Sequence, residues 1–217
     1  LKITQNFNYP LFAQNIADFW RRWHISLTSW LTDYVFMPLN VRWRDWGKGG
    51  MILAIIVDFV LCGLWHGANW TFVLWGFYHG LLFIPLILSG AMFKKKKIET
   101  YAWGFPKINI LGRMLLTFGL VAFGLVLFRA ESVGQAAGYL KGLIQLNGAP
   151  FSVVQISMLA FFIACMLGVE WIQRNREHGL AQMTKSHLLN FAIYYVLVAV
   201  IFNLGSFLTD TFIYFQF

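Results

Sequence analysis

Charged residues are scarce in this sequence. Asp, Glu, Lys and Arg make up 12% of its 217 residues, whereas they make up about 25% of a typical soluble domain. Hydrophobic residues reach 59%, above the usual share of about 45–50%. This composition leaves too little polar surface for a domain in water, so it indicates a protein of the lipid bilayer.

Cysteine is also scarce. Cys62 and Cys165 lie in separate apolar runs, which excludes a disulfide framework and a cysteine-based zinc site. We interpret both as small buried hydrophobic residues. The histidines are not spaced as metal ligands with an acidic third ligand, and no phosphate-binding glycine motif is present. We therefore expect neither a bound metal nor a bound cofactor.

Acidic residues are fewer than basic ones, nine against 17, which gives a net charge of +8. Such an excess can indicate nucleic-acid binding. Here, however, the basic residues lie between apolar segments, where membrane orientation accounts for them. We expect no nucleic-acid partner.

The sequence starts at Leu1 in a polar stretch, without the pattern of a signal peptide. It shows no internal repeat and no linker rich in Pro or Gly. We therefore expect residues 1–217 to form one domain, the C-terminal part of a longer membrane domain whose N-terminal helices are missing from this sequence.

Five segments are apolar enough to enter a membrane, which predicts an all-α fold, a polytopic bundle of transmembrane helices. A span needs about 20 residues, and the first segment is short and carries Asp58. The segments are 51–65, 70–92, 110–128, 153–172 and 188–208.

Basic clusters mark one side of the membrane. With alternating crossings, the clusters at 42–48, 94–97 and 174–185 share a side, which the positive-inside rule makes cytoplasmic. The C-terminus is then outside. The four lysines at 94–97 can also contact anionic lipid.

An amphipathic helix is expected before the first span. Aromatic and apolar residues recur at three- and four-residue steps between Asn15 and Met37. Asp18 lies four residues before Arg22, a favourable helical pair. Pro38 is expected to end the helix.

His66 is the most notable polar residue of the apolar segments. It stands in the sequence GLWHGANW, between Gly63 and Gly67. An ionisable residue at membrane depth is costly and suggests a functional site, and glycine lets the backbone turn or approach a substrate. The alternative is a core histidine bonded to a nearby carbonyl, and the residues alone leave both interpretations open.

Three further polar residues have two interpretations each. His79 is a site residue or a residue of packing and hydrogen bonding. Asn69 positions a group near His66 or caps the helix that follows. Asp58, eight residues before His66, shares a helical face with it and tunes its basicity, or pairs with an arginine elsewhere.

Four sequence blocks resemble the membrane-bound O-acyltransferase family and occur in family order. The wording of the second and third is similar to the bacterial branch of alginate O-acetyltransferases, more than to the D-alanyl transferases of teichoic acids. The blocks are NFNYP (6–10), FWRRWHISLTSWLTDYVFMPL (19–39), GLWHGANWTFVLWGFYHG (63–80) and FIYFQF (212–217). After Pro38-Leu39 the chain reads NVRWR in place of that branch's glycine- and arginine-rich turn.

The resemblance implies a helical bundle around a tunnel, with donor and acceptor reaching the site from opposite faces. It implies that His66 is the catalytic histidine and His24 the second signature histidine. The reaction would move an acyl group, here acetyl, from a thioester donor to hydroxyls of an exported or cell-surface polysaccharide. A histidine can act as general base near neutral pH. His24 would orient the acceptor or stabilise the tetrahedral oxyanion.

The resemblance also implies substrate contacts and partners. We expect Trp23, Trp65 and Trp70 to line the tunnel, and Asn69 to contact substrate. Arg22 would meet an anionic polysaccharide or donor phosphates, or would lie on a solvated face. The co-substrate would be acetyl-CoA or an acyl carrier. The partners would be membrane lipids, the polysaccharide and further acetyltransferases outside the bacterial cell membrane.

Two rival functions remain at the level of sequence. One is D-alanyl transfer to teichoic acid from a carrier protein. The other is a membrane transporter with a proton relay of His66 and Asp58. Transporters often contain inverted repeats, and none is evident in the sequence.

Overall fold

The computed structural model describes residues 4–94, 97–102, 104–145, 152–176 and 184–205. Within these ranges the regular elements are helices, and the only β-type pairing is an isolated bridge between Thr100 and Pro106. The all-α expectation is therefore confirmed. The chain forms two compact units, Leu1–Pro150 and Phe151–Phe217.

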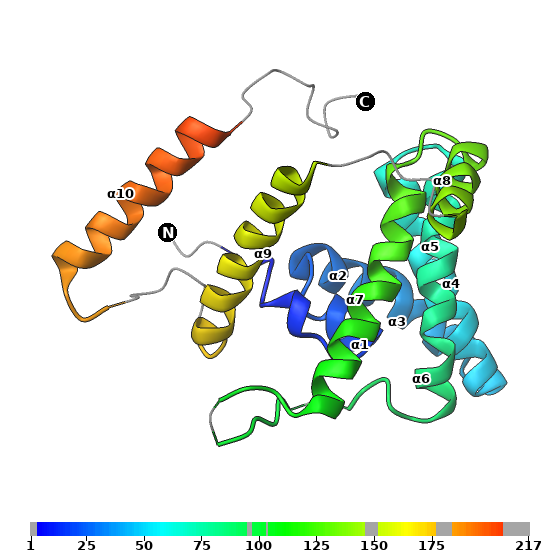
Figure 1. Cartoon of the computed structure of the whole chain (residues 1–217). Coiled ribbons are helices and arrows are strands. Elements are labelled where there is room, and N and C mark those ends of the chain that lie inside the picture. Colours follow the sequence, from blue (N-terminus) through cyan, green and yellow to red (C-terminus); the bar gives the residue numbers. More distant parts are fainter. Residues whose placement is uncertain (1–3, 95–96, 103, 146–151, 177–183, 206–217) are drawn as a thin grey trace. The chain divides into compact units, whose positions relative to one another are not determined.

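The first unit contains eight of the described α-helices (Figure 1). They are α1 (Ile16–Trp20), α2 (Ile25–Leu31), α3 (Met37–Arg42), α4 (Lys48–His66), α5 (Trp70–Leu82), α6 (Ile84–Leu88), α7 (Ile108–Arg129) and α8 (Val133–Gln145). Short 3₁₀ helices at Pro10–Phe12 and Arg44–Trp46 and a π-helical turn at Thr32–Phe36 complete it. The second unit contains α9 (Val153–Gln173) and α10 (His187–Leu204).

Four described helical stretches are long and apolar enough to cross a membrane. They are Lys48–His66, Trp70–Leu88, Ile108–Arg129 and Ile156–Gln173. The second is interrupted at Phe83, just before Pro85, where α5 gives way to α6. The fifth predicted segment forms the shorter apolar helix His187–Asn203. The first segment, expected to be short, is thus a span of full length, and α8 was not predicted.

The prediction of a single helix between Asn15 and Met37 is wrong. The chain forms α1, breaks at 21–24, and continues as α2, the π-helical turn and α3. Asn15 caps α1, because its side chain accepts a hydrogen bond of 2.8 Å from the Asp18 N–H. Pro38 does not end the helix, because it lies in the first turn of α3, where a missing N–H costs nothing.

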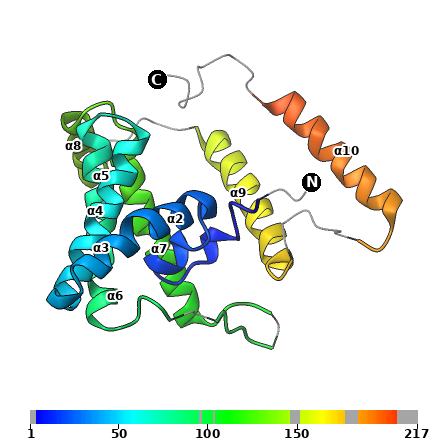
Figure 2. The same cartoon turned by 180° about the vertical axis from the view of Figure 1, so that it is seen from behind.

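Helices α4 and α5 pack closely, and α7 lies against α5 on its other side (Figures 1 and 2). Glycine permits the α4–α5 approach. A Cβ atom at Gly63 would collide with the Phe72 carbonyl, and one at Gly76 with the Phe59 carbonyl. Small residues bring membrane helices together in this way. The close pair places the end of α4 beside the beginning of α5.

Candidate active site

His66 is the last residue of α4, and the residue after it ends the helix. Gly67 has φ 152° and ψ 157°, a backbone region that is essentially restricted to glycine. The prediction that a glycine beside His66 serves a backbone turn is confirmed at Gly67. Gly63 serves helix packing instead. The half-buried His66 side chain therefore lies at a sharp turn between two apolar helices.

Aromatic rings surround the His66 imidazole. Its ring centroid lies 4.8 Å from Trp65, 6.2 Å from Phe72 and 5.5 Å from Trp75. Phe128 of α7 approaches at 4.8 Å, nearly perpendicular to the imidazole. Three helices thus fix the plane of the imidazole by packing.

His24 joins this site from the break between α1 and α2. Its imidazole lies 6.1 Å from the Trp65 ring, and the same Trp65 ring lies 4.8 Å from the His66 imidazole. Its backbone is left-handed, with φ 47° and ψ 52°, which is uncommon outside glycine. Its buried Nδ1 atom has no hydrogen-bond partner among the described residues. The two histidines singled out in the sequence are therefore brought together.

His79 lies in the core, in the last turn of α5. It is 1% exposed, and its Nδ1 atom accepts a hydrogen bond of 3.3 Å from the Trp20 indole N–H. The interpretation of His79 as a residue of packing and hydrogen bonding is confirmed.

Asn69 forms the cap of α5. Its side-chain oxygen accepts from the Thr71 N–H at 3.1 Å, and its amide nitrogen donates to the Glu131 carbonyl at 3.0 Å. The capping alternative is confirmed, and the predicted substrate contact of Asn69 stays a prediction.

Arg22 is bound within the protein. It donates to the buried Asp18 carboxylate at 3.0 Å, as the four-residue spacing predicted. Arg21 instead donates to the Met92 carbonyl at 3.0 Å. Burial lowers the pKa of the Arg21 guanidinium, and the neighbouring Asp18 opposes that shift. The charge of Arg22 thus has a partner before any substrate arrives.

The three tryptophans predicted to line the tunnel have accessible indoles, and Trp70 at the start of α5 is 73% exposed. Trp23 stacks on Phe19 at 5.7 Å and is 39% exposed. Trp65 is 51% exposed and, as described above, touches both site histidines. Trp65 is therefore part of the histidine site. Trp23 lies next to the site because it precedes His24 in the chain.

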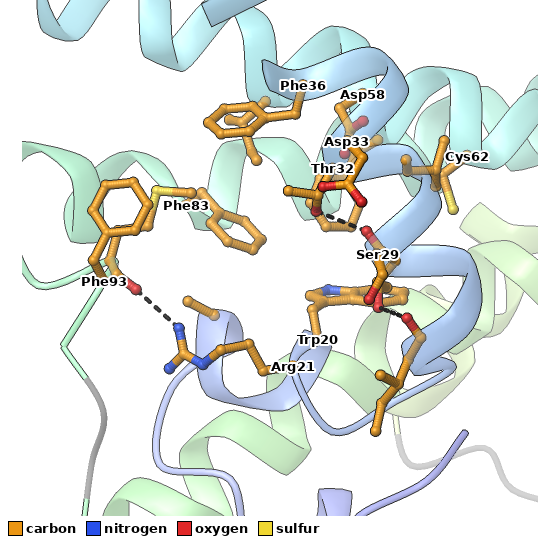
Figure 3. A pocket seen from close by; sticks show the side chains of 17 residues that line it. Trp20, Arg21, Ser29, Thr32, Asp33, Phe36, Asp58, Cys62, Phe83 and Phe93 are labelled. Carbon is orange, nitrogen blue, oxygen red and sulfur yellow. Dashed lines mark hydrogen bonds between the residues drawn. The ribbon is translucent and has the colours of Figure 1, made fainter. Parts of the chain in front are cut away.

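A cavity of about 410 Å³ opens among α1, α2, the π-helical turn, α4 and the segment after α6. Its wall includes Arg21, Phe93 and Asp58, and Cys62 lies at the far end on α4 (Figure 3). Cys62 lies one helical turn before His66, so the cavity reaches to within a turn of the site histidine. Its surface is mostly apolar, with carboxyl, hydroxyl and guanidinium groups in the wall.

Asp58 lies in this cavity wall and is 6% exposed. Its carboxyl group lies against the backbone of Phe36, and its Oδ1 atom has no hydrogen-bond partner among the described residues. Eight residues of helix separate it from His66, about 12 Å along the axis. A direct contact with His66 is therefore excluded, and among the described residues no arginine pairs with Asp58.

Sequence reasoning missed the aromatic residues that hold the site histidines. Trp20, Trp75 and Phe128 were not among the predicted site residues, but Trp20 and Trp75 are buried and Phe128 packs on His66. No local signal distinguishes them, because lipid-facing and core positions of a membrane helix are equally apolar.

The helices and the paired histidines define a multi-pass α-helical membrane protein with a polar site at the end of a span. Comparisons with known proteins identify the family within this class. The family model of the membrane-bound O-acyltransferases matches residues 1–127. The chain belongs to the membrane-bound O-acyltransferase family.

Three relatives illustrate the range of the family. A probable alginate O-acetylase AlgI of Pseudomonas syringae pv. tomato is 34% identical over 81% of this chain and 33% of its own length. The peptidoglycan O-acetyltransferase of Helicobacter pylori is 36% identical over 68% of this chain and 26% of its own. The teichoic acid D-alanyltransferase of Bacillus subtilis is 35% identical over 60% of this chain and 33% of its own. The chain thus spans about a third or less of these relatives.

Proposed function

We propose that this chain carries the catalytic histidine of a bacterial membrane enzyme that moves an acetyl group from a thioester to hydroxyls of an exported or cell-surface polysaccharide. The observation that supports it most is the meeting of His66 and His24 at the end of a span. Two imidazoles from separate family motifs, 42 residues apart, share one aromatic site. We place this chain as the C-terminal part of one membrane domain.

In the proposed reaction, His66 acts as general base. Its unprotonated ring nitrogen takes the proton of the acceptor hydroxyl while the oxygen attacks the thioester carbonyl carbon. The tetrahedral oxyanion then collapses, the carbon–sulfur bond breaks, and His66 returns the proton to the thiolate. The products are an ester and a free thiol. Base assistance of this kind is worth about 10²–10⁴-fold in rate.

His24 is the second imidazole of the mechanism. Its Nδ1 atom is buried and has no hydrogen-bond partner in the part of the chain that the structure describes, so a substrate group can satisfy it. As an N–H donor it would stabilise the oxyanion, and as an acceptor it would orient the hydroxyl. The aromatic surroundings limit the access of water, which protects the thioester from hydrolysis.

The cavity offers a route for the donor. It begins beside Phe93, the residue before Lys94, and ends at Cys62, one turn from His66. A donor arm with amide groups and a terminal phosphate suits a wall that combines Arg21 with hydroxyl and carboxyl groups. We propose acetyl-CoA or an acetylated acyl carrier as that donor, entering from the cytoplasmic side.

Acetyl transfer is favoured over D-alanyl transfer by the extent of similarity. A probable alginate O-acetylase AlgI of Pseudomonas putida matches 100% of this chain at 29% identity, whereas the Bacillus subtilis D-alanyltransferase matches 60%. Polysaccharide O-acetyltransferases outside the membrane are proposed as partners.

The test replaces His66 with Ala in the full-length protein. We expect the O-acetyl content of the cell's polysaccharide to fall by about 10²-fold or more, because the base is lost, at normal abundance of the protein in the membrane. His187→Ala is the matched control, because His187 is an exposed histidine at the start of α10. Full acetylation by His66→Ala at normal abundance would refute the proposal.

A further inference from the structure

We infer that His79 is a positioning residue: through Trp20 and Trp75 it sets the orientation of the His66 imidazole. The inference rests on the proposed role of His66. His79 itself is buried and contacts neither the cavity nor, in the described contacts, the His66 ring.

A histidine at this position needs a reason, because it is surrounded by aromatic side chains. Its ring lies 5.1 Å from Trp20, 4.9 Å from Trp75 and 6.1 Å from Phe59. A buried polar ring in such surroundings is costly unless it is hydrogen-bonded. A phenylalanine would fill the space without that cost, so packing alone does not account for the imidazole.

The hydrogen bond from Trp20 supplies the reason. The Trp20 indole, 7% exposed, donates its N–H to His79 Nδ1 at 3.3 Å. This bond requires an unprotonated Nδ1, so the neutral ring carries its hydrogen on Nε2. Without the acceptor, the indole N–H would be buried and unsatisfied, which costs about 1–3 kcal/mol. His79 therefore fixes the rotation of Trp20, which also forms part of the cavity wall.

The opposite edge of the His79 ring is held by α7. A Cβ atom added at Gly124 would lie 2.8 Å from His79 Nε2. The imidazole ring therefore occupies the space that a side chain at Gly124 would need. The imidazole is thus bounded by Trp20 on one edge and by the α7 backbone on the other. It has little freedom to rotate.

The fixed ring is connected to His66 through one indole. Trp75 packs on His79 with its centroid at 4.9 Å and meets His66 at 5.5 Å, almost perpendicular to it. Phe128 touches both Trp75 and His66, at 5.2 Å and 4.8 Å. Any shift of His79 moves Trp75, and Trp75 forms one wall of the space in which the His66 ring lies. A small displacement of a catalytic group can cost up to about 10²-fold in rate.

The experiment compares three variants in the full-length protein in membranes. His79→Phe removes the acceptor, His79→Asn retains an oxygen acceptor near the position of Nδ1, and Trp20→Phe removes the donor. The donor probe is acetyl-CoA or the cell's acetylated acyl carrier, whichever the wild type turns over. Release of free thiol is measured against donor concentration, and unfolding temperature and abundance are measured in parallel.

We expect His79→Phe and Trp20→Phe to lower kcat by about 10- to 100-fold with the donor KM nearly unchanged. His79→Asn should restore most of kcat. The double variant should lose no more than either single variant, since both remove the same hydrogen bond. The matched control is Tyr78→Phe, which removes the adjacent Tyr78 hydroxyl's bond to the Leu120 carbonyl and should lower stability without lowering kcat.

Three results would overturn the inference. One is normal kcat in His79→Phe. Another is a loss of activity in His79→Phe that the loss of folded protein accounts for completely. The third is a raised donor KM at normal kcat, which would make Trp20 a binding wall. If His79→Phe does not fold, Trp20→Phe and His79→Asn give the same comparison. Activity retained by His66→Ala would instead refute the proposed function, so the two failures are distinguishable.

Discussion

Two residues of the site hold backbone conformations that most side chains avoid. Gly67 lies in a region open essentially to glycine alone, and it lets the chain leave α4 directly after His66. His24 is left-handed without being glycine, a conformation that costs about 1–2 kcal/mol. The surrounding packing maintains this strain where the imidazole meets Trp65.

The left-handed backbone allows the role of the His24 imidazole to be tested. Asn tolerates this conformation better than Ala does. If the imidazole acts in the reaction, His24→Ala should lower thiol release by about 10²-fold, the usual cost of losing an oxyanion donor. His24→Asn should lower it less, because the side-chain amide can still donate a hydrogen bond. His24→Asn should also keep the unfolding temperature of the wild type. Normal turnover in His24→Ala at normal abundance of folded protein would show that the imidazole takes no part in the reaction.

At the scale of elements, the glycines between α4 and α5 determine how closely the two helices approach. Their backbones meet at Gly63 and Gly76, where neither helix can accommodate a Cβ atom. Close backbone contact increases dispersion attraction, which drives helix association in lipid. The same contact holds His66, at the end of α4, beside Phe72 and Trp75 of α5.

Gly76→Ala should therefore separate the two helices. We expect a loss of about 1–3 kcal/mol of stability, the usual cost of overpacking, and a lower yield of folded protein in thermal unfolding measured in detergent. Gly112→Ala is the control, since a Cβ atom at Gly112 on α7 meets no atom within 4 Å. In a helix that change should be neutral or stabilising by about 0.5–1 kcal/mol. Equal stability of the two variants would contradict the packing argument.

At the scale of the whole molecule, two hydrogen bonds in the first unit agree with alternating crossings. Lys48, at the start of α4, donates to the Leu88 carbonyl at the end of α6. Asn69, at the start of α5, donates to the Glu131 carbonyl just after α7. The basic residues around Lys48 and Lys94 thus share one end of these helices, and His66 lies at the other end. This is the arrangement that the loop charges predicted.

Single-cysteine labelling tests the orientation. In a full-length variant with Cys62 and Cys165 replaced by Ala, we expect Glu131→Cys to react with a membrane-impermeant thiol reagent in spheroplasts. Lys94→Cys should react only after the membrane is permeabilised, because the positive-inside rule makes that loop cytoplasmic. The reverse labelling pattern would place His66 at the cytoplasmic end and would rule out the proposed direction of donor entry.

The sequence by itself determined the class of protein, the five apolar segments and the two histidine motifs. These features follow from local composition and spacing, because a span in lipid must be apolar along its own length. The sequence also left two interpretations open for Asn69 and for His79. The structure confirms the structural one for each, because Asn69 caps α5 and His79 is buried and hydrogen-bonded. The break at 21–24 was missed, because the helical periodicity of the apolar residues continues through it.

Only the tertiary structure decided which residues surround His66. His24 reaches it across 42 residues of sequence, Phe128 across 62, and Trp20 bonds to His79 across 59. In lipid the hydrophobic pattern does not distinguish the packed face of a helix from the exposed one. The distinction arises where glycines admit a second backbone and where a buried indole N–H finds an acceptor. Those matches depend on two elements at once, so they exist only in the folded protein.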